Sequence, residues 1–281
     1  MNYRHAFHAG NFADVVKHAV LCRILMYLAA KQAPYRVIDT HAGCGVYDLT
    51  SSAALRSPEW KDGIGRIAGA KLPGPVNALL RPYLDIVEPM MLAPTPTYPG
   101  SPLLALAMAR TQDCLCFVEK HPADTLALKA AVAGDRRARA MTLDGWTAWN
   151  AQVPPPEKRG LVLVDPPFEE SGEFTRLSMG LASAHRKWQT GTTMLWYPIK
   201  NDHIVGNFID TLADTGIRKV LRLEMWVDKV GQDGPLAGTG LIIVNPPYTL
   251  KQEAETLLPF LAQRLSRGPG HGWRAEWVTP E

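Results

Sequence analysis

The chain has 281 residues, of which 46% are hydrophobic and 20% are charged, a balance typical of a globular protein with a substantial core. No apolar run reaches the ~20 residues that a membrane-spanning helix needs, and the polar start, Met1 to His5, lacks the apolar stretch of a signal peptide. We therefore expect a single domain over 1–281, located in the cytoplasm and without contact to a membrane. The net charge of +3 is too small to identify a nucleic-acid-binding protein.

The first predicted element is a helix that begins after Asn11, whose side chain can cap it. Asp14 lies three residues further on, in an arrangement similar to a capping box. An apolar stripe follows at helical spacing, formed by Val16, Val20, Ile24 and Leu28. Pro34 ends this segment.

A strand at 37–39 then runs into the glycine-containing loop 40–45. Residues 46–98 have few strand signals and many prolines, which indicates an insertion of short helices. Alternation resumes with a helix that Ser101 can cap and Pro102 can begin. The strands and helices expected next are strands near 115–119, 138–143 and 161–165, and helices near 122–133 and 173–187.

The last part of the chain has a different pattern. A strand is predicted at 192–197, and the strands 218–227 and 240–245, separated by several glycines, resemble a hairpin. Alternating strands and helices that end in a hairpin predict an α/β fold, with a mainly parallel sheet and one antiparallel strand.

Polar residues at the ends of these strands predict a cofactor site. Gly43 lies in the loop after the first strand, where open parallel sheets bind ligands and where a glycine lets the backbone approach them. Glu119 ends the second core strand and can accept hydrogen bonds from two ribose hydroxyls. Asp144 and Gly145 follow the third strand, and Ser101 begins a helix whose free N–H groups could hold a carboxylate. Each feature alone also fits a simple turn, a solvated charge or a helix cap.

The segment Asp165-Pro166-Pro167-Phe168 predicts the reaction. The exocyclic amine of adenine is a poor nucleophile, and the Asp165 carboxylate and the Pro166 carbonyl could accept its two N–H groups. Proline offers no competing donor, and Phe168 would stack on the base after it leaves its nucleic-acid stack. A similar segment begins at Asn245, but we expect that strand to lie at the margin of the sheet, so Asp165 is the better candidate.

Cysteines and basic clusters carry less information. The four cysteines, including Cys114 and Cys116, are too few and too poorly spaced for a metal site, so we expect reduced thiols and no metal. Basic side chains gather at 136–139, 158–159 and 186–187, where each group could equally be a solvated surface patch.

The dispersed motifs resemble those of the RlmJ family, the bacterial large-subunit ribosomal RNA adenine-N6 methyltransferases. The matching segments cover nearly the whole chain: 3–11, 39–43, 98–102, 165–167, 215–219 and 244–247. The resemblance implies a Rossmann-like class I S-adenosylmethionine-dependent methyltransferase, with a mainly parallel seven-stranded sheet and a small helical insertion at 46–98.

The resemblance also implies the site residues and the partners. The residues expected around S-adenosylmethionine, and around its product S-adenosylhomocysteine, are His18, His41, Gly43, Ser101, Glu119, Asp144, Gly145 and Asp165. Pattern alone would place His18 on the helix surface. Tyr3 is expected to position the RNA, and Phe168 stands where relatives often carry tyrosine. The expected substrate is adenine 2030 (reference numbering) of 23S rRNA, naked or early in ribosome assembly, methylated by a monomer.

Three other functions are compatible with parts of the sequence. The catalytic segment does not separate RNA from DNA, so a DNA adenine-N6 methyltransferase is one alternative. A non-catalytic RNA-binding protein on the same fold is another, although the presence of both Asp165 and Glu119 argues against it. A nicotinamide oxidoreductase is disfavoured because the glycine loop departs from the dinucleotide-binding pattern.

Overall fold

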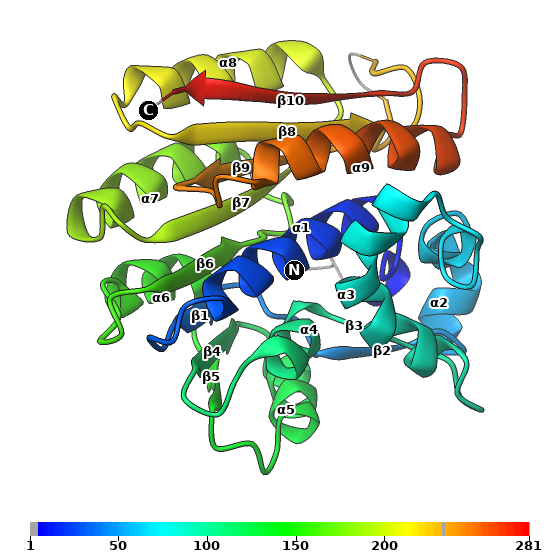
Figure 1. The fold of residues 1–281 in the computed structure, drawn as a ribbon, viewed down its shortest axis with the longest axis horizontal. Helices are drawn as coiled ribbons and strands as arrows, with labels where there is room; N and C mark the ends of the chain where they lie inside the picture. Colours follow the sequence, from blue (N-terminus) through cyan, green and yellow to red (C-terminus); the bar gives the residue numbers. More distant parts are fainter. Residues whose placement is uncertain (1–4, 232–233, 281) are drawn as a thin grey trace.

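The computed structural model describes residues 5–231 and 234–280. Its centre is a sheet with the strand order β10-β8-β9-β7-β6-β1-β4-β5, and a second, two-stranded sheet pairs β2 with β3 (Figure 1). The strands are β1 (Arg36–Asp39), β2 (Val46–Asp48), β3 (Thr97–Pro99), β4 (Cys114–Glu119), β5 (Ala138–Thr142), β6 (Gly160–Val164), β7 (Thr192–Ile199), β8 (Val220–Trp226), β9 (Gly238–Val244) and β10 (Gly272–Thr279). Because Tyr3 lies outside the described residues, its expected role is not addressed by the structure.

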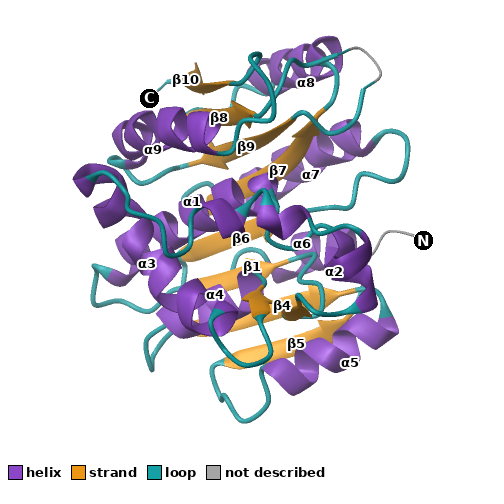
Figure 2. Ribbon diagram, turned by 90° about the vertical axis from the view of Figure 1, so that its right-hand side faces the viewer, coloured by secondary structure: helices purple, strands orange, loops and turns teal. Residues whose placement is uncertain are grey.

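Helices cover both faces of the main sheet (Figure 2). The helices are α1 (Phe12–Ala29), α2 (Ser52–Arg56), α3 (Gly74–Met91), α4 (Ser101–Met108), α5 (Pro122–Ala131), α6 (Gly145–Gln152), α7 (Glu173–Lys187), α8 (Asp202–Asp214) and α9 (Leu250–Arg264), with short 3-10 turns at His5–Phe7, Glu59–Lys61 and Ile64–Arg66. One hydrophobic cluster joins α1, α3, α4 and α9 to the sheet, and a second joins α6, α7 and α8 to its other face.

The strand directions confirm the predicted α/β class and correct its details. Strands β1, β4, β5, β6 and β7 are parallel, and the largely apolar sequences of β4, β6 and β7 fit burial on both faces. The main sheet has eight strands rather than seven, because β10 adds to the edge next to β8. Two strands, β9 and β10, run against the others, rather than the single one predicted.

Helix α1 is nearly enclosed by the core. Asn11 caps it as predicted, since its side chain accepts hydrogen bonds from the N–H groups of Ala13 and Asp14. Asp14 accepts from the Gly10 N–H at 2.8 Å, one residue earlier than a capping box would require. The apolar stripe is buried, but so is most of the opposite side of the helix, because α3, α4 and α9 surround it.

The segment 46–98 extends this same layer. It contains β2, α2 and α3, and most of β3, and α3 continues for 18 residues although Pro82 and Pro89 lie within it. Buried side chains of α3, among them Val76, Leu80 and Tyr83, belong to the cluster that α1 and α9 also join. The inserted segment therefore packs directly behind α1, the helix that carries His18.

Candidate active site

A cavity of about 770 Å³ opens at the carboxyl ends of the parallel strands. Strand β1 is flanked by β4 on one side and β6 on the other, so the strand order reverses at β1, where open α/β sheets bind ligands. The predicted residues that line the cavity are His18, His41, Gly43, Ser101, Glu119, Asp144, Gly145, Asp165 and Pro166. The structure thus brings together side chains from four strand ends and from α1.

Glu119 fastens the glycine loop to the end of β4. Its two oxygens accept hydrogen bonds from the N–H of Gly43 at 2.9 Å and the N–H of His121 at 2.7 Å. Gly43 has a φ of +62°, and a Cβ at this position would lie 2.2 Å from the Tyr47 hydroxyl. Each Glu119 oxygen keeps a further lone pair, so the carboxylate can still accept hydroxyl donors from a ligand.

Asp144 begins helix α6 and faces the cavity from the end of β5. It caps α6 by accepting from the Thr147 N–H at 3.0 Å, and the Lys120 ammonium lies 3.5 Å away. Burial opposes ionisation, but these donors bring the pKa of Asp144 below its ordinary value. At Gly145 a Cβ would lie 2.2 Å from the Thr40 carbonyl oxygen, so only glycine lets α6 approach the β1 loop this closely.

Asp39, at the end of β1, is a deeply buried acid beside the cavity. The Ser101 hydroxyl donates to it at 2.6 Å, and the His41 N–H donates at 3.3 Å. The predicted capping role of the Ser101 hydroxyl is therefore wrong: Gly100 occupies the cap position of α4, and the hydroxyl tethers α4 to β1 instead. Burial raises the pKa of Asp39 to about 7, although the Ser101 hydrogen bond partly offsets this.

His41 lines the cavity next to Asp39. Its Nδ1 lies 2.8 Å from the Thr40 hydroxyl, and its ring packs edge-on against Trp146 at 5.5 Å between centroids. Desolvation lowers the pKa of His41 to about 4, so the ring is neutral near pH 7.

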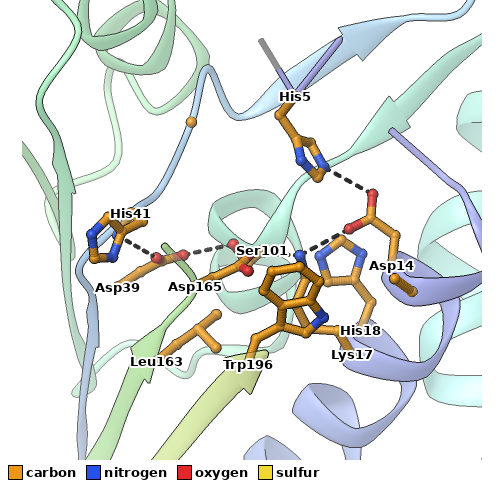
Figure 3. A network of polar contacts seen from close by, with 12 residues as sticks. His5, Asp14, Lys17, His18, Asp39, His41, Ser101, Leu163, Asp165 and Trp196 are labelled. Carbon is orange, nitrogen blue, oxygen red and sulfur yellow. Dashed lines mark hydrogen bonds and ion pairs between the residues drawn. The ribbon is translucent and has the colours of Figure 1, made fainter. Parts of the chain in front are cut away.

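Lys17 joins the catalytic candidate Asp165 to α1 (Figure 3). Its ammonium lies 2.5 Å from Oδ2 of Asp165 and 2.9 Å from Oδ1 of Asp14, and its side chain is only 4% exposed. Burial alone would lower the pKa of Lys17, but the two carboxylates raise it above its ordinary value. Two carboxylates therefore share this one ammonium.

Asp14 has a further partner in His5, whose Nε2 lies 2.9 Å from its Oδ2. Burial opposes ionisation of Asp14, but His5 and Lys17 hold its pKa well below the ordinary range. Asp14 therefore stays charged and anchors Lys17, which in turn orients Asp165.

His18 is buried, so its placement on the helix surface from pattern alone was wrong. Only 1% of the residue is exposed, and its Nδ1 lies 2.7 Å from the Tyr98 hydroxyl. Burial lowers the pKa of His18 to about 3. It belongs with the cavity residues, as the family resemblance implied and the helical pattern did not.

The Asp-Pro-Pro-Phe segment follows β6 directly. Asp165 and both prolines line the cavity, whereas Phe168 is not among the lining residues. Phe168 has a φ of +51°, and its partly buried ring packs edge-on against Phe174 at 4.9 Å and Trp196 at 5.7 Å. In this conformation Phe168 supports the turn from behind, and stacking on a substrate base would require its ring to move.

Asn245 and Asp165 lie at opposite ends of the strands, that is, on opposite sides of the sheet along the strand direction. Strand β9, which Asn245 follows, is the third strand from the edge rather than marginal, but it runs antiparallel to β7. Its carboxyl end therefore meets the amino ends of the parallel strands. There the Asn245 amide donates to the carbonyl oxygens of Gln189 and Gly191, at 2.7 and 2.9 Å. Its role is to hold the turn before β7.

The three basic clusters also lie away from the cavity. The first runs into the start of β5, the second directly precedes β6, and the third ends α7 before β7, so all three lie at the amino ends of parallel strands. Arg137 pairs with Asp135 and donates to backbone carbonyls, and Arg159 donates to the carbonyls of Ala33 and Leu28. These two guanidinium groups therefore bind neighbouring chain segments at this edge of the sheet.

Sequence reasoning missed several polar residues of the cavity: His5, Lys17, Trp146, Glu173 and Arg176. Lys17 had a readable signal, because a lysine three residues after an aspartate in an apolar helix indicates a buried ion pair. Glu173 had none. It is buried at 4% exposure, and its Oε2 has no hydrogen-bond partner among the residues that the structure describes. Burial, followed by the charge of Glu170, raises the pKa of Glu173 to about 7.

Within 5–231 and 234–280, no three His, Cys, Asp or Glu side chains are grouped so that they could hold a metal ion. Among the helices of these same ranges, none is both long and apolar enough to span a membrane.

A family model, two curated relatives and a crystal structure are similar to this chain over most of its length. The family model described as "Ribosomal RNA large subunit methyltransferase D, RlmJ" matches residues 32–279. Two curated relatives, both named ribosomal RNA large subunit methyltransferase J, come from Escherichia coli (strain K12) and Haemophilus influenzae. They are 38% and 34% identical over 284 aligned residues, with 100% of each chain covered. A crystal structure of protein LPL1258 from Legionella pneumophila is 34% identical, covers 96% of this chain and 98% of its own, and has a TM-score of 0.87.

Proposed function

Because the chain belongs to the RlmJ family of ribosomal RNA large-subunit methyltransferases, we propose that it methylates the N6 amine of an adenine in 23S rRNA with S-adenosylmethionine. The expected position is adenine 2030 in the family's reference numbering. The observation that carries the proposal is the position of Asp165. Its carboxylate lines the cavity at the end of β6, and the ammonium of buried Lys17 holds one of its oxygens.

The residues present fit S-adenosylmethionine. Gly43 and Gly145 line the cavity without side chains, and the Glu119 carboxylate retains lone pairs for ribose hydroxyls. Asp144 can accept from the amine of the cofactor's adenine. The Asp165 carboxylate, which lines the cavity, suits a cationic ligand. When bound, S-adenosylmethionine supplies the methyl group on a positively charged sulfonium.

The chain's own residues then prepare the acceptor amine. Lys17 occupies Oδ2 of Asp165, and among the described residues Oδ1 has no hydrogen-bond partner. Oδ1 and the Pro166 carbonyl can accept the two N–H groups of the adenine amine, which fixes the direction of the nitrogen lone pair. The proton that the amine loses on methylation can pass to Asp165, directly or through water. Catalysis rests mainly on alignment and electrostatics.

The test is methyl transfer to 23S rRNA fragments and to DNA of matching sequence, followed by mapping of the methylated nucleotide. We expect labelling of one adenine N6 in RNA, and cellular 23S rRNA that lacks this methyl group when the protein is absent. Labelling of DNA alone would instead support a DNA methyltransferase.

Asp165→Ala tests the catalytic assignment. We expect S-adenosylhomocysteine to bind the variant nearly as it binds the wild type, while transfer falls by about 100-fold or more. If the wild-type protein binds neither form of the cofactor in calorimetry, a non-catalytic RNA-binding role replaces this proposal.

A further inference from the structure

Two buried tyrosines form a hydrogen-bond chain that ends on His18. The Tyr83 hydroxyl lies 2.8 Å from the Tyr98 hydroxyl, which lies 2.7 Å from Nδ1 of His18. Both tyrosines are 0% exposed. Tyr83 belongs to α3 and Tyr98 to β3, so both come from the inserted segment 46–98.

The number of protons on the two hydroxyls and the imidazole determines which group donates in each hydrogen bond. Of the residues that the structure describes, only Tyr98 is a hydrogen-bond partner of the Tyr83 hydroxyl. If Tyr83 donates to Tyr98 and Tyr98 donates to Nδ1 of His18, every hydroxyl proton has an acceptor. If Nδ1 of His18 donates instead, one tyrosine proton is left buried without an acceptor. Such a group disfavours that arrangement by about 5- to 150-fold.

The favoured arrangement determines the tautomer of His18. Burial keeps the ring neutral, because it lowers the pKa of His18 to about 3. Since Nδ1 accepts from Tyr98, the single ring proton is on Nε2. Among the described residues nothing hydrogen-bonds to Nε2 of His18. This atom is also not among the unpartnered polar atoms that are fully buried. Since His18 lines the cavity, Nε2 is open to it.

We propose that Tyr98, supported by Tyr83, is a positioning residue that holds His18 in the Nε2–H tautomer, so that Nε2 donates a hydrogen bond to the carboxylate of the cofactor's amino-acid portion. The ligand part of this inference rests on the proposed function. Ser101 supports the choice of a carboxylate, since it follows Tyr98 by three residues and begins α4. At the start of that helix Pro102 has no N–H, and the Leu103 N–H donates to the Gly100 carbonyl at 3.1 Å. Among the described residues the Ser101 N–H has no carbonyl partner, and its place at the helix start favours an anion. Tyr98 of the inserted segment thereby orients the His18 donor, and the start of α4 offers the Ser101 N–H at the same cavity.

The tautomer is tested first, without any ligand. Protein labelled with ¹⁵N-histidine reports the protonated nitrogen of each ring by NMR, and His18→Gln identifies the His18 signals. We expect the Nε2–H form in the wild type and a mixture in Tyr98→Phe. Tyr83→Phe should keep the Nε2–H form, because Tyr98 still has only Nδ1 to donate to. Tyr27→Phe is the matched control. Tyr27 lies on α1 with His18 but is not part of the hydrogen-bond chain, so this variant should leave the His18 tautomer unchanged.

Binding of two ligands then tests the carboxylate. S-adenosylhomocysteine carries the amino-acid portion, whereas 5′-methylthioadenosine lacks it. We expect Tyr98→Phe to weaken S-adenosylhomocysteine about three- to tenfold and His18→Asn about tenfold or more, with 5′-methylthioadenosine unchanged for both. His18→Gln, whose amide reaches the place of Nε2, should retain most of the affinity that His18→Asn loses.

An Nδ1–H tautomer in the wild type would overturn the inference, and so would equal weakening of both ligands. If Tyr98→Phe does not fold, the wild-type spectrum still decides the tautomer, and His18→Asn against His18→Gln decides the contact. Failure of the wild type to bind S-adenosylhomocysteine would instead contradict the proposed function, while the spectrum would still test the tyrosine chain.

Discussion

Replacing Lys17 with methionine tests the buried ion cluster most directly. Methionine keeps the unbranched shape but removes the ammonium that lies between Asp14 and Asp165, at 2.9 and 2.5 Å. Lys17 and Asp14 have side chains that are 4% and 1% exposed, so the variant leaves a carboxylate buried without its main cation. Removing one partner of a buried pair costs about 3–5 kcal/mol, so we expect the free energy of unfolding to fall by this amount at pH 7.

The loss should depend on pH in a defined direction. In the wild type the pKa of Asp14 is depressed, so the stability it contributes is fully present above its unfolded pKa of 3.8 and is lost only as the pH falls through the lower folded value. Without Lys17, Asp14 binds a proton at higher pH, which removes the uncompensated charge. The destabilisation should therefore shrink between pH 7 and pH 5, as measured by urea unfolding at both values.

Lys251→Met is the matched control. Lys251 also pairs with a carboxylate on a helix, Glu255, but both side chains are partly exposed, at 32% and 42%. Such a surface pair contributes about 0.2–1 kcal/mol, so this variant should remain close to the wild type at both pH values. Similar losses for the two variants, or a Lys17→Met loss of the same size at pH 5 and pH 7, would refute the reasoning.

Three further outcomes follow from the site geometry. Asn245→Ala should lower the free energy of unfolding by about 1–2 kcal/mol, through its lost carbonyl contacts, and leave methyl transfer unchanged; a rate loss like that of Asp165→Ala would contradict the edge assignment. Gly145→Ala should weaken S-adenosylhomocysteine binding in calorimetry, since its Cβ meets backbone, whereas Gly206→Ala, with open space in α8, should stabilise the fold by about 0.5–1 kcal/mol. Asp39 has a raised folded pKa of about 7, so it reduces stability as the pH rises from about 4 to 7; Asp39→Asn should remove that part of the slope in urea unfolding, and an unchanged slope would disprove it.

The arrangement of the strand-end residues was predictable from the sequence because of one property of parallel sheets. All parallel strands present their carboxyl ends at the same edge, so Gly43, Glu119, Asp144 and Asp165 had to lie near one another once their strands were identified. Their separation of more than 120 residues along the chain does not matter to this argument.

Strand direction was harder to predict. The motifs at Asp165 and Asn245 have nearly the same local sequence, and the pairing of β9 with β7 alone shows that they face opposite edges. The expected place of β9 at the margin was wrong because β9 pairs with β7 on one side and with β8 on the other, and β10 adds a further strand beyond β8.

The sequence by itself determined the fold class, the strand ends that carry polar residues and the preference for Asp165, since all of these depend on local patterns and on the common direction of parallel strands. Only the tertiary structure decided which polar residues of α1 are buried, because the apolar stripe predicted one covered face, while α3, α4 and α9 cover nearly the whole helix. Burial is what converts Lys17 into a partner of Asp165 and joins His18 to the tyrosines of the inserted segment. Such contacts depend on segments that are distant in sequence, and no spacing along one helix encodes them.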